Sequence, residues 1–260
     1  MSFLTVEHIH HIYFTKDTAT LALDDIDLTI EKGEFISFLG PSGCGKTTLL
    51  SIIAGLIQPT EGKVKLANQT ISKPNPLVGY MLQQDYLFPW KTIEDNVTIG
   101  LKIIGQLTAD KKERTLNLLK EMGLSSVEKQ FPHQLSGGMR QRAALVRTLS
   151  TNPEMLLLDE PFSALDYQTK LKLEDLVFQT LKDYQKTALL VTHDIGEAIA
   201  MSDKIFVFSA KPGKVARTYI VPGQLRELTP FHARQHPQFT DLFQQIWKEL
   251  DQLETKTEIN

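Results

Sequence analysis

The 260-residue sequence has little of several features that mark particular classes of protein. It contains a single cysteine, so no disulfide can form within the chain, and we expect a reducing compartment. No apolar run approaches the ~18 residues that a membrane-spanning helix needs. Residues 1–8 lack the basic and apolar regions of a signal peptide, so we do not expect secretion.

An excess of positive charge is also missing. Lysine and arginine together number 28, aspartate and glutamate 31, and the net charge is −3. Because a nucleic-acid-binding surface needs a basic field, we expect no nucleic acid partner. What remains is an ordinary globular composition, 42% hydrophobic and 23% charged, in a length that suits one large domain or a domain with an inserted subdomain.

Residues 40–47 read Gly-Pro-Ser-Gly-Cys-Gly-Lys-Thr and fit the phosphate-loop pattern G-x-x-x-x-G-K-[ST] at every fixed position. An apolar run of strand composition precedes them at 35–39, and a buried helical pattern follows at 48–54. The glycines allow backbone amides to curl around an anion, and the following helix directs its positive end toward it. The alternative, a glycine turn with a coincidental lysine, is disfavoured by this strand and helix.

The phosphate loop predicts where a nucleotide would bind. Lys46 would reach the β- and γ-phosphates, and the Thr47 hydroxyl would hold Mg²⁺. Cys44 is interpreted as a small filler rather than a catalytic thiol, because no histidine partner is evident. The predicted nucleotide-binding residues here are Gly40, Pro41, Ser42, Gly43, Cys44, Gly45, Lys46, Thr47 and Thr48.

A second segment, Met-Leu-Leu-Leu-Asp-Glu-Pro at 155–161, runs from four apolar residues into two acids. This pattern is typical of a buried parallel strand that ends at an active site. Asp159 could bind the Mg²⁺ carried by Thr47, and Glu160 could take the proton from an attacking water. Alone, two acids after a strand could equally cap a helix; together with the phosphate loop they favour catalysis.

Hydrophobic periodicity predicts an α/β fold. Between about 85 and 150 the pattern is helical without convincing strands, which indicates an all-helical insertion. Beyond about 225 an amphipathic stripe suits either core packing or a partner site. Predicted strands are 4–13, 26–30, 35–39, 63–66, 77–82, 155–158, 187–192, 204–208 and 215–221. Predicted helices are 46–56, 93–101, 111–122, 137–150, 168–184, 196–201 and 239–253.

A third segment, Leu-Ser-Gly-Gly-Met at 135–139, places a hydroxyl and two glycines at a helix start. That is again an anion site, so one domain carries two phosphate-binding devices. The combination resembles the ATP-binding cassette (ABC) ATPases, whose identifying motif is Leu-Ser-Gly-Gly-Gln. Met139 departs from that motif at its fifth residue.

The resemblance covers almost the whole chain and implies its organisation. The expected fold is an ABC-type P-loop nucleotide-binding domain of the α/β class, with a RecA-like core, an antiparallel β subdomain and an inserted all-helical subdomain. Residues 1–225 would form the ATPase domain, with the helical subdomain inserted at about 85–150. Residues 226–260 would be a C-terminal helical extension.

The resemblance also implies further site residues. Tyr13 would stack on adenine, and His193 would contact the γ-phosphate. Gln83 would sense Mg²⁺ and water, with Gln84 as the neighbouring alternative. Residues 163–166 match the loop that crosses the dimer interface. The implied catalytic residues are Lys46, Gln83, Glu160 and His193; the implied Mg²⁺ ligands are Thr47, Gln83 and Asp159; Ser136, Gly137 and Gly138 would complete the ATP site of a second copy of the chain.

The function that follows is ATP hydrolysis, with ATP and Mg²⁺, coupled to import of a small solute. The chain would act at the cytoplasmic face of the membrane with separate permease subunits, and indirectly with an extracytoplasmic solute-binding protein. Segments 87–91 and 209–213 resemble the nitrate, sulfonate and taurine branch, which includes relatives for vitamin precursors. A soluble ABC ATPase without a transport role is the alternative. The aromatic cluster at 86–90 would either fill the core or line a groove for a membrane subunit.

Overall fold

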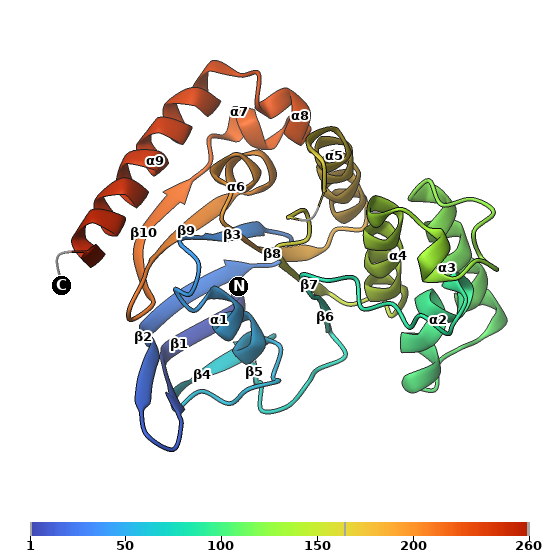
Figure 1. Ribbon diagram of the computed structural model, residues 1–260, viewed down its shortest axis with the longest axis horizontal. Coiled ribbons are helices and arrows are strands. Elements are labelled where there is room, and N and C mark those ends of the chain that lie inside the picture. The colour runs from blue at the N-terminus through green and yellow to red at the C-terminus, as the bar shows by residue number, and fades with distance from the viewer. Residues whose placement is uncertain (1, 164, 259–260) are drawn as a thin grey trace.

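The computed structural model describes residues 2–163 and 165–258 and contains two β-sheets (Figure 1). The six-stranded sheet has the order β10-β9-β3-β8-β7-β6. The five strands from β9 to β6 run parallel to one another, and β10, at one edge, is antiparallel to β9. Its strands are β3 (Phe35–Leu39), β6 (Val78–Met81), β7 (Met155–Asp159), β8 (Thr187–Thr192), β9 (Lys204–Ser209) and β10 (Lys214–Ile220).

The three central strands of this sheet position the functional segments. Every residue of β3, β7 and β8 is buried, because helices cover both faces of a parallel sheet and apolar side chains must fill both. The carboxyl ends of these strands run directly into residues 40–47, 160–163 and 193–194. Parallel strands end at the same edge, so segments far apart in sequence meet there.

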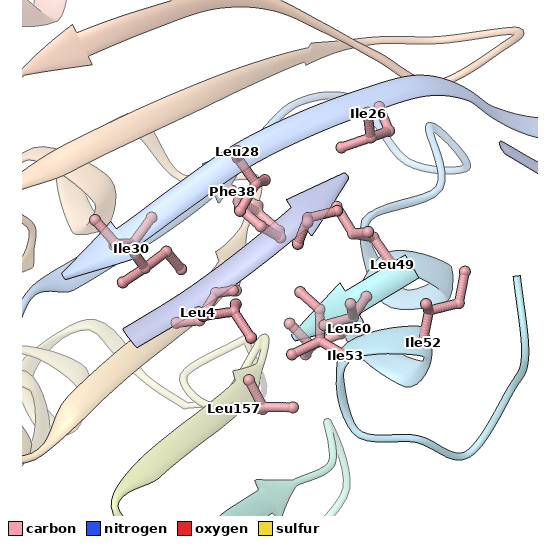
Figure 2. Packing of buried hydrophobic residues seen from close by; sticks show 14 of the residues in the cluster. Leu4, Ile26, Leu28, Ile30, Phe38, Leu49, Leu50, Ile52, Ile53 and Leu157 are labelled. Carbon is pink, nitrogen blue, oxygen red and sulfur yellow. The ribbon is translucent and has the colours of Figure 1, made fainter. Parts of the chain in front are cut away.

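The second sheet is antiparallel, with the order β2-β1-β4-β5. The helix α1 (Lys46–Ile53) packs between the two sheets, and side chains from both meet it in one core, as Figure 2 shows for Leu4, Phe38 and Leu157. The strands are β1 (Ser2–Phe14), β2 (Ala19–Glu31), β4 (Glu61–Leu66) and β5 (Gln69–Thr70).

The strand β2 begins seven residues earlier than the predicted 26–30. Asp25 has φ +53° and the pairing of β1 with β2 shifts register nearby, so this part of the pair is bulged. The buried residues Leu23 and Ile26 are therefore three apart instead of two, which breaks the alternation that sequence analysis uses.

Between β6 and β7 the chain is helical. Residues 82–154 are all described and contain no strand, in agreement with the pattern at 85–150. Thr92 caps the first helix by accepting a bond from the Asp95 amide, and Gly123, with φ +68°, follows the end of the second. The elements are α2 (Ile93–Ile103), α3 (Ala109–Glu121), the 3₁₀ turn η1 (Pro132–Gln134) and α4 (Gly137–Ser150).

The C-terminal helices cover the other face of the large sheet (Figure 1). On α9, Leu242 and Ile246 are buried against this face, whereas Trp247 is 59% exposed, so the apolar stripe is mostly core packing. The helices are α5 (Tyr167–Asp183), α6 (Ile195–Met201), α7 (Gly223–Arg226), α8 (Pro230–Ala233) and α9 (Pro237–Glu258). Within 2–163 and 165–258, none of the helices combines the length and apolar character of a membrane span.

Candidate active site

The phosphate loop joins β3 to α1, and its shape depends on glycine. Gly45 forms the N-terminal cap of α1 with φ +91°, a conformation that side-chain-bearing residues rarely adopt. A Cβ at Gly45 would lie 2.7 Å from Leu23 Cδ2 and 2.9 Å from the Ala22 carbonyl oxygen. The loop therefore packs directly on β2 and leaves its amides at the positive end of α1.

The Lys46 side chain folds back over this loop. It is 5% exposed, and Nζ donates to the carbonyl oxygens of Gly40 at 2.7 Å and Pro41 at 2.9 Å. A buried ammonium held by backbone carbonyls at a helix N-terminus is positioned to bind an anion. The Cys44 thiol is also buried, and burial raises its pKa, which opposes the thiolate that catalysis would need.

Two oxygen ligands for a hard cation lie beside the loop. The Thr47 hydroxyl donates to Asp159 Oδ1 at 3.1 Å, and Tyr80 OH donates to Asp159 Oδ2 at 3.4 Å. Burial raises the pKa of the Asp159 carboxyl above its usual range, while the Thr47 hydrogen bond opposes that shift. A hydroxyl and a carboxylate in contact are the donors that Mg²⁺ prefers, so these residues fit the ion.

The Glu160 carboxylate is held from two sides. Gln83 Nε2 donates to Oε2 at 3.2 Å, and His193 Nδ1 lies 3.3 Å from Oε1. Glu160 has φ +46°, an uncommon backbone conformation of the kind that accumulates at functional sites. Among the described residues, no hydrogen bond joins Gln84 to this group. The structure thus brings three of the predicted catalytic residues together from the ends of β6, β7 and β8.

Two side chains of α4 hold the segment that carries Gln83, and the sequence analysis did not predict them. Gln141 of α4 donates through Nε2 to the carbonyl oxygens of Gln83 at 3.3 Å and Pro161 at 2.9 Å. Arg147 donates to the backbone carbonyls of Asp85 and Tyr86, each at 2.7 Å. The loops that these two side chains of α4 meet are set by tertiary structure, which helical periodicity does not give.

The phosphate loop and Glu160 line a cavity of about 430 Å³ at the carboxyl edge of the sheet. That volume lies in the usual range of small-molecule sites. Tyr13 is one of the lining residues; its OH is 3.2 Å from the Thr48 hydroxyl, and the residue is 42% exposed. The lining residues are Tyr13, Thr20, Leu21, Ala22, Ser42, Gly43, Gly45, Lys46, Thr47, Thr48, Glu160 and Lys211.

The second predicted anion site lies apart from this cavity. Ser136 caps α4 by accepting a bond from the Met139 amide at 3.4 Å, and a Cβ at Gly138 would lie 2.8 Å from Thr169 Cγ2. Neither Ser136, Gly137 nor Gly138 lines the cavity. The nearby segment 163–166 is described except for Ala164, which lies outside the described residues.

His193 lines a different cavity, which the sequence did not indicate. Together with Phe243, Trp247 and Leu250 it lines a cavity of about 380 Å³ between the end of β8 and α9. The rings of Phe243 and Trp247 stack at 6.4 Å between centroids. The C-terminal helix therefore lies next to the loop that carries the predicted γ-phosphate contact.

The arrangement combines three kinds of group. The phosphate loop and its lysine form a positively charged cradle, a hydroxyl and a carboxylate offer oxygen ligands to a metal ion, and a second carboxylate is held by an amide and an imidazole. The cradle and ligands suit a polyphosphate with its metal, and the fixed carboxylate suits a general base. The set matches phosphoryl transfer to water, and the Tyr13 ring is available to stack on the nucleobase of a nucleotide.

Comparison with known proteins agrees with this geometry. Residues 23–163 match the ABC transporter family. The chain is 63% identical over 254 residues to the ABC transporter ATP-binding protein YtlC of Bacillus subtilis, covering 98% of each chain. It is 42% identical over 212 residues to the taurine import ATP-binding protein TauB of Escherichia coli, covering 82% of each.

A solved structure shares the fold. The ATP-binding cassette MJ0796, in a dimeric post-hydrolysis state with ADP and phosphate, superposes with a TM-score of 0.75 at 32% identity. The match covers 85% of this chain and 99% of that one. With the family match and the identity to YtlC across almost the full length, these findings show that the chain belongs to the ATP-binding proteins of ABC transporters and is an ATPase.

Proposed function

We propose that this ATPase powers the import of a small solute through separate membrane subunits, acting at the cytoplasmic face of the membrane. The observation that carries the catalytic part is the Glu160 carboxylate, held by Gln83 and His193 at 3.2 and 3.3 Å beside the phosphate loop. The import part is supported by TauB and by the aliphatic sulfonates import protein SsuB of Bacillus cereus, which is also 42% identical.

Each residue of the site has a role in this proposal. Glu160 accepts the proton of the water that attacks the γ-phosphorus, and Gln83 and His193 fix its carboxylate. Lys46 and the loop amides neutralise charge that develops on the phosphates. Thr47 and Asp159 would hold Mg²⁺, which supplies further charge neutralisation when bound.

A second copy of the chain completes the site. Ser136, Gly137 and Gly138 lie outside the cavity of their own chain, and the relative MJ0796 is known as a dimer. We infer that the helix start at Ser136 of a second copy closes over the nucleotide, as an anion site facing the phosphates. Two chains then form two composite sites.

The exposed aromatic residues at the end of the Gln83 segment are the proposed contact with a membrane subunit. Leu87 is buried, as expected of a core residue, but Trp90 is 72% exposed and its ring contacts Phe88 at 5.5 Å between centroids. Asn96 fixes the same segment through hydrogen bonds to the Phe88 amide and carbonyl. An exposed aromatic on a fixed backbone is a typical binding hot spot.

Two measurements test the proposal. Purified chain should hydrolyse ATP, and Lys46→Ala should abolish hydrolysis while the circular dichroism spectrum stays native. Cells that lack the gene should lose uptake of a sulfonate or related small solute, and the wild-type gene but not the Lys46→Ala gene should restore it. Normal uptake of every solute of this class in the deleted strain, with an active purified ATPase, would contradict the import role.

A further inference from the structure

The turn between β9 and β10 lies against the phosphate loop and β2 (Figure 1). Gly213 donates its amide to the Ala22 carbonyl and accepts from the Asp24 amide, both at 3.0 Å. A Cβ at Gly213 would lie 2.1 Å from the Cys44 carbonyl oxygen, so no other residue fits. The backbone of residues 209–213 is therefore fixed relative to the loop that binds phosphate.

Lys211 at the tip of this turn lines the nucleotide cavity, together with Tyr13, Lys46 and Thr47. It has φ +57°, a left-handed conformation that is uncommon for lysine and that sets the direction in which its side chain leaves the turn. This residue lies about fifty residues after Glu160, within the 209–213 segment that resembles the nitrate, sulfonate and taurine branch, and it is not one of the nucleotide-binding residues predicted from the sequence.

The ammonium of Lys211 has no hydrogen bond or ion pair with any residue in 2–163 or 165–258. Its neighbour Lys214 differs, because Lys214 Nζ lies 2.5 Å from Asp24 Oδ2 and does not line the cavity. Lys46, the other lysine of the cavity, is buried and already bonded to backbone carbonyls. Within the part of the chain that the structure describes, Lys211 is thus a cation without a matching anion, and it borders the proposed phosphate site.

We propose that Lys211 is a further nucleotide-binding residue, whose ammonium contacts the phosphate chain of the bound nucleoside triphosphate. The proposal rests on the ATP site proposed above. A lysine ammonium is a compact charge that pairs with phosphate oxygens from several directions. Backbone hydrogen bonds of Gly213 hold the turn in place. Only the Lys211 side chain therefore has to be ordered when the nucleotide binds, which lowers the entropic cost of binding.

Nucleotide binding to three variants tests this role. Titration calorimetry with ATP, without hydrolysis, should show a dissociation constant about 3- to 10-fold higher for Lys211→Gln than for the wild type, the effect of one partly exposed charge-assisted bond. Lys211→Arg keeps the charge and should stay close to the wild type. The affinity of Lys211→Gln should also fall less steeply with added salt, because one screened contact is gone.

Controls separate this inference from the site itself. Lys214→Gln, at the start of β10 beside the turn but outside the cavity, should bind ATP like the wild type, and thermal melts should show that all variants fold. If Lys46→Ala loses binding while Lys211→Gln binds as the wild type does, Lys211 is not a nucleotide contact and the ATP site stands. If Lys211→Arg is as weak as Lys211→Gln, charge is not the cause and the proposal is wrong. A wild type that binds no ATP would overturn the site as well.

Discussion

Glu174 is a buried carboxylate whose titration should shape the stability of the protein. It lies on α5 with 0% exposure, and Arg234, just after α8, places Nη2 2.7 Å from Oε2. Lys170 on the same helix pairs with Asp194 at 2.7 Å and Glu197 at 2.5 Å. Three acids thus share two cations at the junction of α5, α6 and the C-terminal helices, next to the loop that carries His193.

The magnitude follows from burial. Neither oxygen of Glu174 accepts a well-aligned hydrogen bond within the described residues. Burial raises the pKa of Glu174 to about 7, from 4.5, although Arg234 opposes the shift. At a pH between these two pKa values, the native state keeps a proton on Glu174 that the unfolded chain has released. The free energy of unfolding therefore falls as pH rises through this window, in total by about 3 kcal/mol.

Urea unfolding of the wild type and of Glu174→Gln, followed by circular dichroism from pH 5 to pH 8, measures this contribution. The wild type should lose about 2–3 kcal/mol more stability over that range than the variant, since groups away from Glu174 titrate alike in both. Glu113→Gln, an exposed glutamate on α3, should give a curve parallel to the wild type. Parallel curves for Glu174→Gln and the wild type would show that Glu174 titrates as it does in water and would refute the reasoning.

Two further outcomes concern the assembly. Mixing Lys46→Ala chains with Ser136→Arg chains should restore part of the ATPase activity, because one composite site then carries both lesions and the other none; a mixture no more active than its components would argue against shared sites. Trp90→Ala should spare the ATPase of the isolated chain but abolish solute uptake by the assembled transporter, since the exposed ring contributes no core packing. Normal uptake with a destabilised domain would place the membrane contact elsewhere.

The phosphate loop and the acid pair were predictable because local patterns decide them. A buried strand followed by fixed glycines specifies the loop between β3 and α1, and four apolar residues before Asp159 specify β7. The short elements β5, α7 and α8, of two to four residues, escaped prediction because they are shorter than the windows that reveal periodicity.

The residues that support the site could not be predicted for a different reason. Gln141 and Lys211 are single polar residues that no local pattern marks as part of the site, and their roles depend on which loop the fold brings against them. The approach of α9 to His193 is of the same kind. Local pattern thus predicts the groups that contact phosphate through a motif, whereas groups that act through tertiary contact need the fold.

The most direct test of the catalytic site is the steady-state rate of phosphate release by Glu160→Gln at saturating MgATP, with binding measured on the same sample. The amide keeps the size of the carboxylate but cannot accept the proton of the attacking water. We expect MgATP binding to persist and the rate to fall by about 10²- to 10⁴-fold, the usual contribution of a positioned general base. A Glu160→Gln protein that binds MgATP and hydrolyses it at the wild-type rate would contradict the assignment of Glu160 as the base and, with it, the proposed mechanism.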